Sequence, residues 1–561
     1  MLSDQQSQRY LHRLLLALLL VVGLALRLYG ITWDDNHHLH PDERQITMVV
    51  SRLGMPPLSQ WPAFFTPPPF STPSEEKPNF FDAETSPLNP HFFAYGSLPF
   101  YLLRITTHLL TVPAGLAEYF SSWPLVAQFL SGLGRMSDYD HITLVGRALS
   151  ALIDTAIICL TYLLGKRVYD RRVGLLAALL VTFTVFHIQL AHFYAVDTLL
   201  TFFVLLFFVF ALDFAREGGL WNALLMGGSF GLALATKFSA APLALVIVGS
   251  YSLRYRRQGR RVWGRLGQLF LLTIVACAVV FFFAEPYAIL DFDAFAAGIA
   301  EQGRMVRGIA DYPYTRQYIG TTPYLYQIRE TAEWGMGLPL GLVAYGGLGY
   351  FLWRVVREKK GEELLLLAWV APYFLITGSF TVKFMRYMLP LLPSFLIMGA
   401  AMLFAFKDAL HRRAPERKVV RSAIWYGLTG LIIASSVLYV WAFTSIYSRP
   451  HSRIQASEWI YRNVLPGSTL ALEHWDDDLP LSRTVDVRPR SIGEYQTLKM
   501  NLYEPEEGGP GQRVDEALDR VRERFGQEAL SRARLLEAQQ RRKRRRGETM
   551  PGLDAERDGK R

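Results

Sequence analysis

Carboxylates and imidazoles are concentrated in residues 36–44, directly after the first hydrophobic segment of the chain. This stretch contains the adjacent acids Asp42 and Glu43, preceded by Pro41 and three histidines. Charge beside hydrocarbon is costly, so such a cluster at the end of a membrane helix calls for a function. Transfer of a glycosyl or acyl group to a hydroxyl needs one carboxylate that accepts the hydroxyl proton. We therefore interpret the stretch as a catalytic site at a membrane face.

Adjacent acids can divide two roles between them. Neighbouring side chains of a strand or turn point to different sides, so Asp42 is expected to be the base and Glu43 to bind the acceptor, a metal or a fixing arginine. A solvated helix cap is the alternative interpretation. His40 and Glu43 are also candidate ligands of a divalent metal such as zinc or manganese. Their spacing matches no strong metal signature, so dependence on a divalent metal stays open.

Three further charged residues lie at the ends of predicted membrane spans and are candidates for substrate binding. Asp197 stands at the mouth of one span, where the alternative is a simple helix cap. Lys237 separates two spans and is either a snorkelling lysine or a cation for a phosphate group. The planar guanidinium of Arg386 suits bidentate contact with a phosphate better than the ammonium group of Lys237 does. Asp154 lies inside a span and is either functional or bonded to a neighbouring helix.

Two other groups of residues are open to a functional and a structural interpretation. His187, His192 and Asp197 follow at intervals of five residues, about 140° apart on a helix, so they are not predicted to share a face. Tyrosines and arginines between 304 and 334 could stack on sugars and hold phosphates. They are equally typical of an aromatic belt at the membrane interface, which is the interpretation we favour.

Composition indicates an integral membrane protein. Of 561 residues, 51% are hydrophobic and only 19% are charged. The net charge of +10 lies in short basic runs between apolar segments, a pattern of cytoplasmic loops that argues against nucleic-acid binding. The two cysteines fall inside apolar runs, which makes a disulfide framework or a cysteine metal site unexpected.

The hydropathy pattern predicts an all-α polytopic membrane protein with about eleven transmembrane helices. The first helix is expected to be uncleaved, with its N-terminus in the cytoplasm and Arg27 snorkelling or bound. Ten further spans of close to ~20 residues each follow, at 146–165, 173–190, 198–214, 221–236, 239–253, 266–284, 335–353, 363–379, 387–406 and 422–444. The basic runs then share the cytoplasmic side, and the candidate site residues share the extracytoplasmic side.

Three segments complete the predicted domain organisation around the membrane domain, residues 1–444. The first extracytoplasmic loop spans 31–145 and is rich in proline, with 98–133 expected to lie on the outer leaflet as amphipathic helices or to form a pair of spans. Residues 445–507 are expected to form a small extracytoplasmic α/β segment, with a helix at 452–464 and a strand at 468–475. Residues 508–561 form a charged tail, predicted to be disordered.

Several motifs in this order resemble the lipid-carrier-dependent glycosyltransferases of the GT-C type, which include protein O-mannosyltransferases and aminoarabinose transferases. The likeness covers about residues 10–480, and its motifs are specific by order and topology rather than singly. They are His40-Pro41-Asp42-Glu43, the stretch 89–99 around Tyr95, Ala195-Val196-Asp197-Thr198, Ala235-Thr236-Lys237 and Arg386-Tyr387-x-Leu-Pro-x-x-Pro393.

The resemblance implies a polyprenyl-phosphate sugar donor, an inverting transfer, and Asp42 and Glu43 as catalytic residues. It also places His40 and Tyr95 among the residues that bind substrate. The acceptor would be a protein, lipid or glycan hydroxyl at the extracytoplasmic face. Two alternatives stay open: a transporter or flippase, which should show two similar halves with broken helices, and a non-catalytic subunit that binds lipid-linked sugar.

Overall fold

The computed structural model describes residues 4–67, 78–259, 262–413, 418–474 and 477–500. Its contacts divide the chain into two compact units, one that ends at Pro450 and one that begins at His451. The first unit is a helical bundle, and the second is a small unit with one helix and four short strands in its described part. The predicted tail, 508–561, lies outside the described residues.

Long apolar helices form the bundle. By length and composition, seven helical stretches of the described chain could cross a membrane. They contain α1 (Asp4–Leu28), α6 (Tyr139–Val168), α9 (Val196–Glu217), α12 (Trp263–Ala284), α17 (Gly361–Gly378), α18 (Leu392–Arg413) and α19 (Lys418–Thr444). The pair α7 (Arg171–Thr182) and α8 (Val185–Ala191), bent by 59°, would make an eighth crossing. The protein is thus the multi-pass, largely helical membrane protein predicted from hydropathy.

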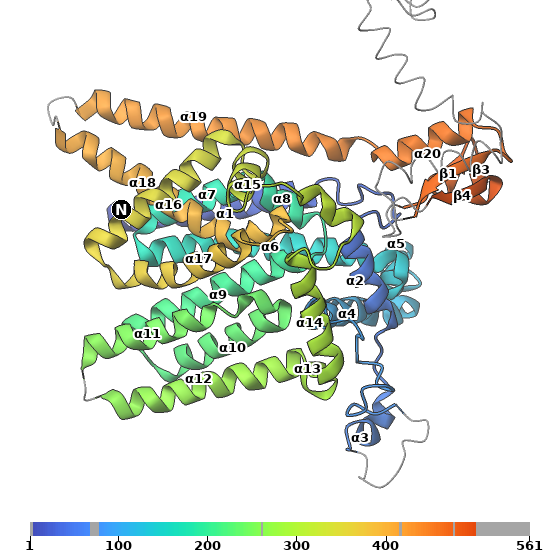
Figure 1. The fold of residues 1–561 in the computed structure, drawn as a ribbon, viewed down its shortest axis with the longest axis horizontal. Coiled ribbons are helices and arrows are strands. Elements are labelled where there is room, and N and C mark those ends of the chain that lie inside the picture. Colours follow the sequence, from blue (N-terminus) through green and yellow to red (C-terminus); the bar gives the residue numbers. More distant parts are fainter. Residues whose placement is uncertain (1–3, 68–77, 260–261, 414–417, 475–476, 501–561) are drawn as a thin grey trace, which may run out of the picture. The chain divides into compact units, whose positions relative to one another are not determined.

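The other predicted spans are also helical: α10 (Leu220–Thr236), α11 (Leu243–Gln258) and α16 (Leu338–Glu358). The helices run back and forth between two ends of the bundle (Figure 1). The start of α1, the ends of α11 and α18 and the starts of α12 and α19 lie at one end, and α2 (Pro41–Arg52) and α14 (Phe292–Val306) lie at the other. Arginines at the C-terminal ends of α6, α9 and α11 share the first of these ends, where they contact Asp213 and Glu362. The count of eleven crossings stays a prediction.

Short helices cover the opposite end of the bundle. In the first loop, α4 (Leu98–Thr111) and α5 (Pro124–Leu133) have 14 and 10 residues, too short to cross about 30 Å of hydrocarbon. Exposed apolar side chains at Tyr119, Trp123 and Leu125 are typical of helices at a membrane surface. The remaining short elements are η1 (Leu58–Gln60), α3 (Trp61–Phe64), η2 (Val112–Phe120), η3 (Gly134–Ser137), η4 (Phe238–Ala240), α13 (Tyr287–Leu290), η6 (Pro313–Tyr318), α15 (Leu325–Glu330), η7 (Thr331–Gly335), η8 (Met385–Leu391) and η10 (Ser445–Ser448).

Glycines allow close contacts that position the end of α10. A Cβ atom on Gly227 or Gly231 would lie 2.2 or 2.6 Å from a carbonyl oxygen of α12, so these glycines let α10 and α12 pack backbone to backbone. At Gly96, a Cβ would lie 1.8 Å from the carbonyl oxygen of Ala235. The N–H of Gly96 also donates to the carbonyl of Thr236 at 3.1 Å. The first loop is thereby held against the last turn of α10.

The second unit begins with α20 (Ser452–Asn463), close to the predicted helix. Strand β1 (Thr469–Glu473) lies within the predicted strand and pairs in parallel with β4 (Gln496–Met500). Strands β2 (Arg483–Val485) and β3 (Arg488–Arg490) form an antiparallel hairpin, followed by η11 (Ile492–Glu494). Tyr461, Val485 and Tyr495 form the small core of this unit.

Candidate active site

The N-terminus of α2 presents Asp42 at the non-basic end of the bundle. His40 is the N-cap of this helix, and its Nδ1 accepts a hydrogen bond from the backbone N–H of Glu43 at 3.3 Å. Pro41 occupies the first helical position, where its fixed φ is favourable and its missing N–H costs nothing. The N-cap is therefore His40, and not the pair Asp42 and Glu43 to which the cap interpretation referred. This cap also explains why Asp42, in the first turn, has a defined direction.

Asp42 contacts one cation and one phenol. Its Oδ2 lies 2.8 Å from Nη1 of Arg386, and Tyr95 donates its hydroxyl to Oδ1 at 2.8 Å. Burial would raise the pKa of Asp42, but the charge of Arg386, with smaller contributions from His40, Tyr95 and Lys237, outweighs it and holds the pKa below its ordinary value. The carboxylate is ionised at neutral pH, and 18% of its side chain is exposed.

Asp197 extends this contact into a chain of four charges. Its Oδ1 accepts a hydrogen bond from Nζ of Lys237 at 2.8 Å, and its Oδ2 lies 3.7 Å from Nε of Arg386. The carboxylate of Asp197 is buried, whereas Lys237 and Arg386 are partly exposed. The charges therefore alternate in the order Asp42, Arg386, Asp197, Lys237. Four elements far apart in the sequence supply them, which matches the predicted convergence at this end.

Glu43 points away from this chain. Both of its oxygens accept hydrogen bonds from Arg147 at 2.6–3.1 Å, and one also accepts the N–H of Tyr194 at 3.0 Å. Arg147 in turn donates to both oxygens of Asp34 at 2.8 Å. Of the roles predicted for Glu43, the structure selects the fixing arginine. The side chain of Glu43 is 1% exposed, and its predicted role as a catalytic residue stays a prediction.

The two candidate metal ligands do not form a metal site. The ring of His40 stacks on Phe193 with centroids 4.1 Å apart, and burial lowers the pKa of His40 to about 4. The oxygens of Glu43 are occupied by Arg147. In the part of the chain that the structure describes, no group of three or more His, Cys, Asp or Glu residues could hold a metal ion. His40 and Glu43 are thus a helix cap and an ion-pair partner.

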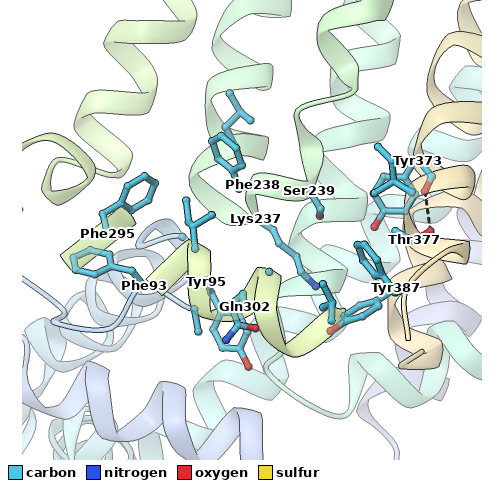
Figure 2. A pocket seen from close by; sticks show the side chains of 18 of the residues that line it. Phe93, Tyr95, Lys237, Phe238, Ser239, Phe295, Gln302, Tyr373, Thr377 and Tyr387 are labelled. Carbon is cyan, nitrogen blue, oxygen red and sulfur yellow. Dashed lines mark hydrogen bonds between the residues drawn. The ribbon is translucent and has the colours of Figure 1, made fainter. Parts of the chain in front are cut away.

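A mostly apolar cavity opens beside Lys237 (Figure 2). Its volume is about 270 Å³, and it lies between the first loop, the end of α10, α14 and α17. Lys237 reaches into it toward Tyr387, and its Nζ lies 4.7 Å from the centre of that ring. Apolar lining comes from Phe93, Phe238, Phe295, Ile299, Val306, Ile376 and Phe380. A hydrocarbon chain fits such a lining, with an anionic head group at the lysine.

Glu285 is an acid in the wall of the cavity and was not predicted. It caps α12, and its carboxylate accepts the N–H of Ser97 and, at 2.8 Å, the hydroxyl of Ser97. Burial raises the pKa of Glu285 to about 8, and the two hydrogen bonds from Ser97 only partly oppose this. The group is therefore mostly protonated at neutral pH. Its position directly after a predicted span was the available signal.

Arg147 and Asp154, two charged residues of α6, each form ion pairs with buried partners. Arg147 lies inside a predicted span and was missed, although any cation there is a functional candidate by default. Asp154 accepts from Nε of Arg27 at 2.6 Å and lies 2.7 Å from Nδ1 of His187. The structural alternative is thus correct for Asp154, and Arg27 is bound rather than snorkelling. His187 contacts Asp154, whereas His192 bonds to the carbonyl of Tyr29 and Asp197 to Lys237.

Residues 124–282 match the family model of dolichyl-phosphate-mannose-protein mannosyltransferases. No curated protein sequence matches the chain. An oligosaccharyltransferase from Archaeoglobus fulgidus is similar in structure, with 14% identity, 82% of this chain and 59% of the other covered, and a TM-score of 0.48. The chain therefore spans about three-fifths of that protein's length.

Two further solved structures are similar. One is ArnT from Cupriavidus metallidurans bound to undecaprenyl phosphate, with 13% identity, 91% of each chain covered and a TM-score of 0.45. The other is the Pmt1–Pmt2 protein O-mannosyltransferase complex of S. cerevisiae bound to its sugar donor, with 14% identity, 55% of this chain and 37% of the other covered, and a TM-score of 0.34. The match over residues 124–282 confirms the predicted resemblance of this chain to the lipid-carrier-dependent glycosyltransferases.

Proposed function

We propose that the protein is a membrane glycosyltransferase that moves a sugar from a polyprenyl-phosphate donor to an acceptor hydroxyl at the extracytoplasmic face. The observation that carries the proposal is the charge chain from Asp42 to Lys237 at the edge of an apolar cavity. A base, two cations and a hydrocarbon-binding surface are the parts that this reaction needs. The family match over residues 124–282 supports the same reaction class.

The two cations suit a phosphate leaving group. A phosphate departs without a general acid, provided that cations stabilise its developing charge. Lys237 lies in the cavity wall, and Arg386 is its neighbour in the charge chain through Asp197. The polyprenyl chain would lie along the apolar lining, with its phosphate between these side chains. Asp197 holds both cations in place.

Asp42 is the general base in this proposal. It is ionised, partly exposed and oriented by Tyr95, so it can accept the proton of an acceptor hydroxyl. Asp42 and Lys237 stand at the two ends of the charge chain. A sugar between them would receive the hydroxyl on one side and lose phosphate on the other. That direct displacement inverts the configuration at the anomeric carbon.

The ion pair between Asp42 and Arg386 suggests how donor binding activates the base. A phosphate that takes the guanidinium of Arg386 removes the partner that holds the pKa of Asp42 low. Asp42 then becomes more basic while Tyr95 still orients it. The pKa of the Tyr95 hydroxyl is raised well above its ordinary value, by burial first and then by Asp42, so Tyr95 stays a hydrogen-bond donor.

Replacement of Asp42 by Asn tests the proposal. Purified protein is assayed for transfer from a panel of polyprenyl-phosphate sugars to a mixture of hydroxyl acceptors, and for binding of undecaprenyl phosphate. We expect Asp42→Asn to lower transfer by about 10²–10⁴-fold while lipid binding persists, because only proton acceptance is lost. The matched control is Glu84→Gln, which removes an exposed carboxylate from the same loop.

Two results would contradict the proposal. Wild-type transfer rates in Asp42→Asn would remove Asp42 from the chemistry. If the protein moved lipid-linked sugar between the two leaflets of proteoliposomes without transferring the sugar to an acceptor, it would be a flippase instead.

A further inference from the structure

Aromatic rings form a ladder beside the charge chain. Phe384 is its centre: the guanidinium carbon of Arg386 lies 4.3 Å from the centre of this ring. The ring of Tyr314 is tilted by 30° to that of Phe384, with centroids 6.3 Å apart. Tyr318 and Tyr387 meet the same ring edge-on, at 5.4 and 5.6 Å. These rings come from two segments, the connection after α14 and the first residues of η8 with its N-cap, Phe384. The ladder therefore joins η6, in the connection after α14, to Arg386.

Among these rings, that of Tyr314 is exposed to solvent. Its side chain is 46% exposed, whereas Tyr318 and Tyr387 are buried. Tyr312 stacks on Tyr314 almost in parallel, with centroids 5.5 Å apart and planes 9° apart. The hydroxyl of Tyr312 bonds to Glu301, and that of Tyr314 lies 3.5 Å from the sulfur of Met305. One face of the Tyr314 ring is thus covered and held.

Tyr314 also lies within electrostatic range of the reacting groups. Burial raises the pKa of its hydroxyl, Asp42 raises it further, and Arg386 opposes the effect of Asp42. An interfacial anchor would have no reason to stand beside a carboxylate and a guanidinium. The position agrees better with a ring that contacts a ligand bound beside this ion pair. This separates Tyr314 from the aromatic belt to which the sequence assigned the whole connection.

We propose that Tyr314 is a specificity-determining residue, against which the apolar C–H face of the donor's sugar ring stacks. The inference rests on the proposed function, because that function places a sugar between Asp42 and the phosphate-binding cations. Aromatic faces bind the C–H-rich side of a pyranose, which strips water from the sugar and orients it. Tyr312 supports the ring from behind, and Phe384 connects it to Arg386.

A paired binding measurement isolates the contribution of the sugar. Undecaprenyl phosphate and a panel of undecaprenyl-phosphate hexoses and pentoses are titrated into wild type, Tyr314→Phe and Tyr314→Leu. For at least one sugar, we expect wild type to bind the sugar-linked lipid about tenfold more tightly than the bare phosphate. Tyr314→Phe keeps this gain because it keeps the ring. Tyr314→Leu loses it, while its affinity for undecaprenyl phosphate stays at the wild-type value.

The control variant is Trp334→Leu, which removes a 62% exposed aromatic side chain from the same connection but outside the ladder. It should leave both affinities unchanged. A sugar gain that persists in Tyr314→Leu, or the absence of any sugar gain in wild type, overturns the inference and leaves the proposed function standing. If wild type binds neither lipid, the proposed function itself fails.

Discussion

At the residue scale, adjacent side chains of one motif have separate tasks. Asp42 faces Arg386 and Tyr95, whereas Glu43 is bonded to Arg147. Removing Arg147 would leave two buried carboxylates unpaired, a change that typically costs about 3–5 kcal/mol. The ion pair of Glu43 with Arg147 attaches the first turn of α2 to α6. It thereby fixes the orientation of the neighbouring Asp42. The motif carries one candidate base and one anchor for it.

Glu285 provides a prediction of pH dependence. Its pKa is raised to about 8 by burial, so folding favours its protonated form. The stabilisation is complete below the ordinary pKa near 4.5 and is lost as pH rises through about 8. We expect wild type to lose stability over this window by at most about 1.4 kcal/mol per pH unit from this group. Glu285→Gln keeps a neutral side chain and should remove that slope.

Thermal unfolding of both proteins in the same detergent, from pH 5 to 9, measures this difference. The midpoint of Glu285→Gln should rise relative to wild type as the pH increases. Parallel curves for the two proteins would show that Glu285 is ionised throughout the range. Glu84→Gln, an exposed acid, should follow wild type.

At the scale of elements, the site depends on how closely the first loop approaches α10. Gly96 is pressed against the carbonyl of Ala235, Tyr95 precedes it, and Lys237 follows the last turn of α10. The contact therefore sets the distance between the residue that orients the base and a cation for the phosphate. Neither residue type nor hydropathy reveals it, because a glycine in a loop has many possible reasons.

We predict that Gly96→Ala impairs both stability and activity. The new methyl group would meet a backbone oxygen at 1.8 Å, so the loop must move away from α10. Overpacking of this kind typically costs about 1–3 kcal/mol, and the shift would separate Tyr95 from Asp42. The midpoint of thermal unfolding and the transfer rate are the measurements. Gly115→Ala is the matched control, since nothing lies within 4 Å of its added Cβ; equal behaviour of the two variants would refute the prediction.

At the scale of the whole molecule, the charge pattern and the helix directions define two faces of the bundle. The basic connections gather at one end, and the candidate site lies at the other. From the positive-inside rule, we predict that the basic end is cytoplasmic. The site would then face the compartment in which lipid-linked sugars reach extracytoplasmic acceptors.

Labelling of single cysteines tests this orientation. With Cys159 and Cys277 replaced by alanine, we expect Glu84→Cys to react with a membrane-impermeant maleimide on intact cells. Glu358→Cys, at the end of α16, should react only after the membrane is permeabilised. The reverse pattern would place the site in the cytoplasm and exclude an extracytoplasmic reaction.

The sequence by itself determined the membrane class, most helix positions and the four charged residues that form the charge chain. It did so because hydrocarbon imposes a strong and local signal of length and apolarity, and because charges near it are conspicuous. Asp42, Asp197, Lys237 and Arg386 were all identified in this way. The predicted order of membrane crossings placed all four residues on the same side of the membrane.

Only the tertiary structure decided which candidates touch one another. It paired Asp42 with Arg386, turned Glu43 and His40 to structural tasks, and brought Glu285 and Tyr314 beside the site. These outcomes depend on distances of a few ångström between segments hundreds of residues apart. They are set by side-chain direction and by close packing at residues such as Gly96, which leave no periodic mark on the sequence.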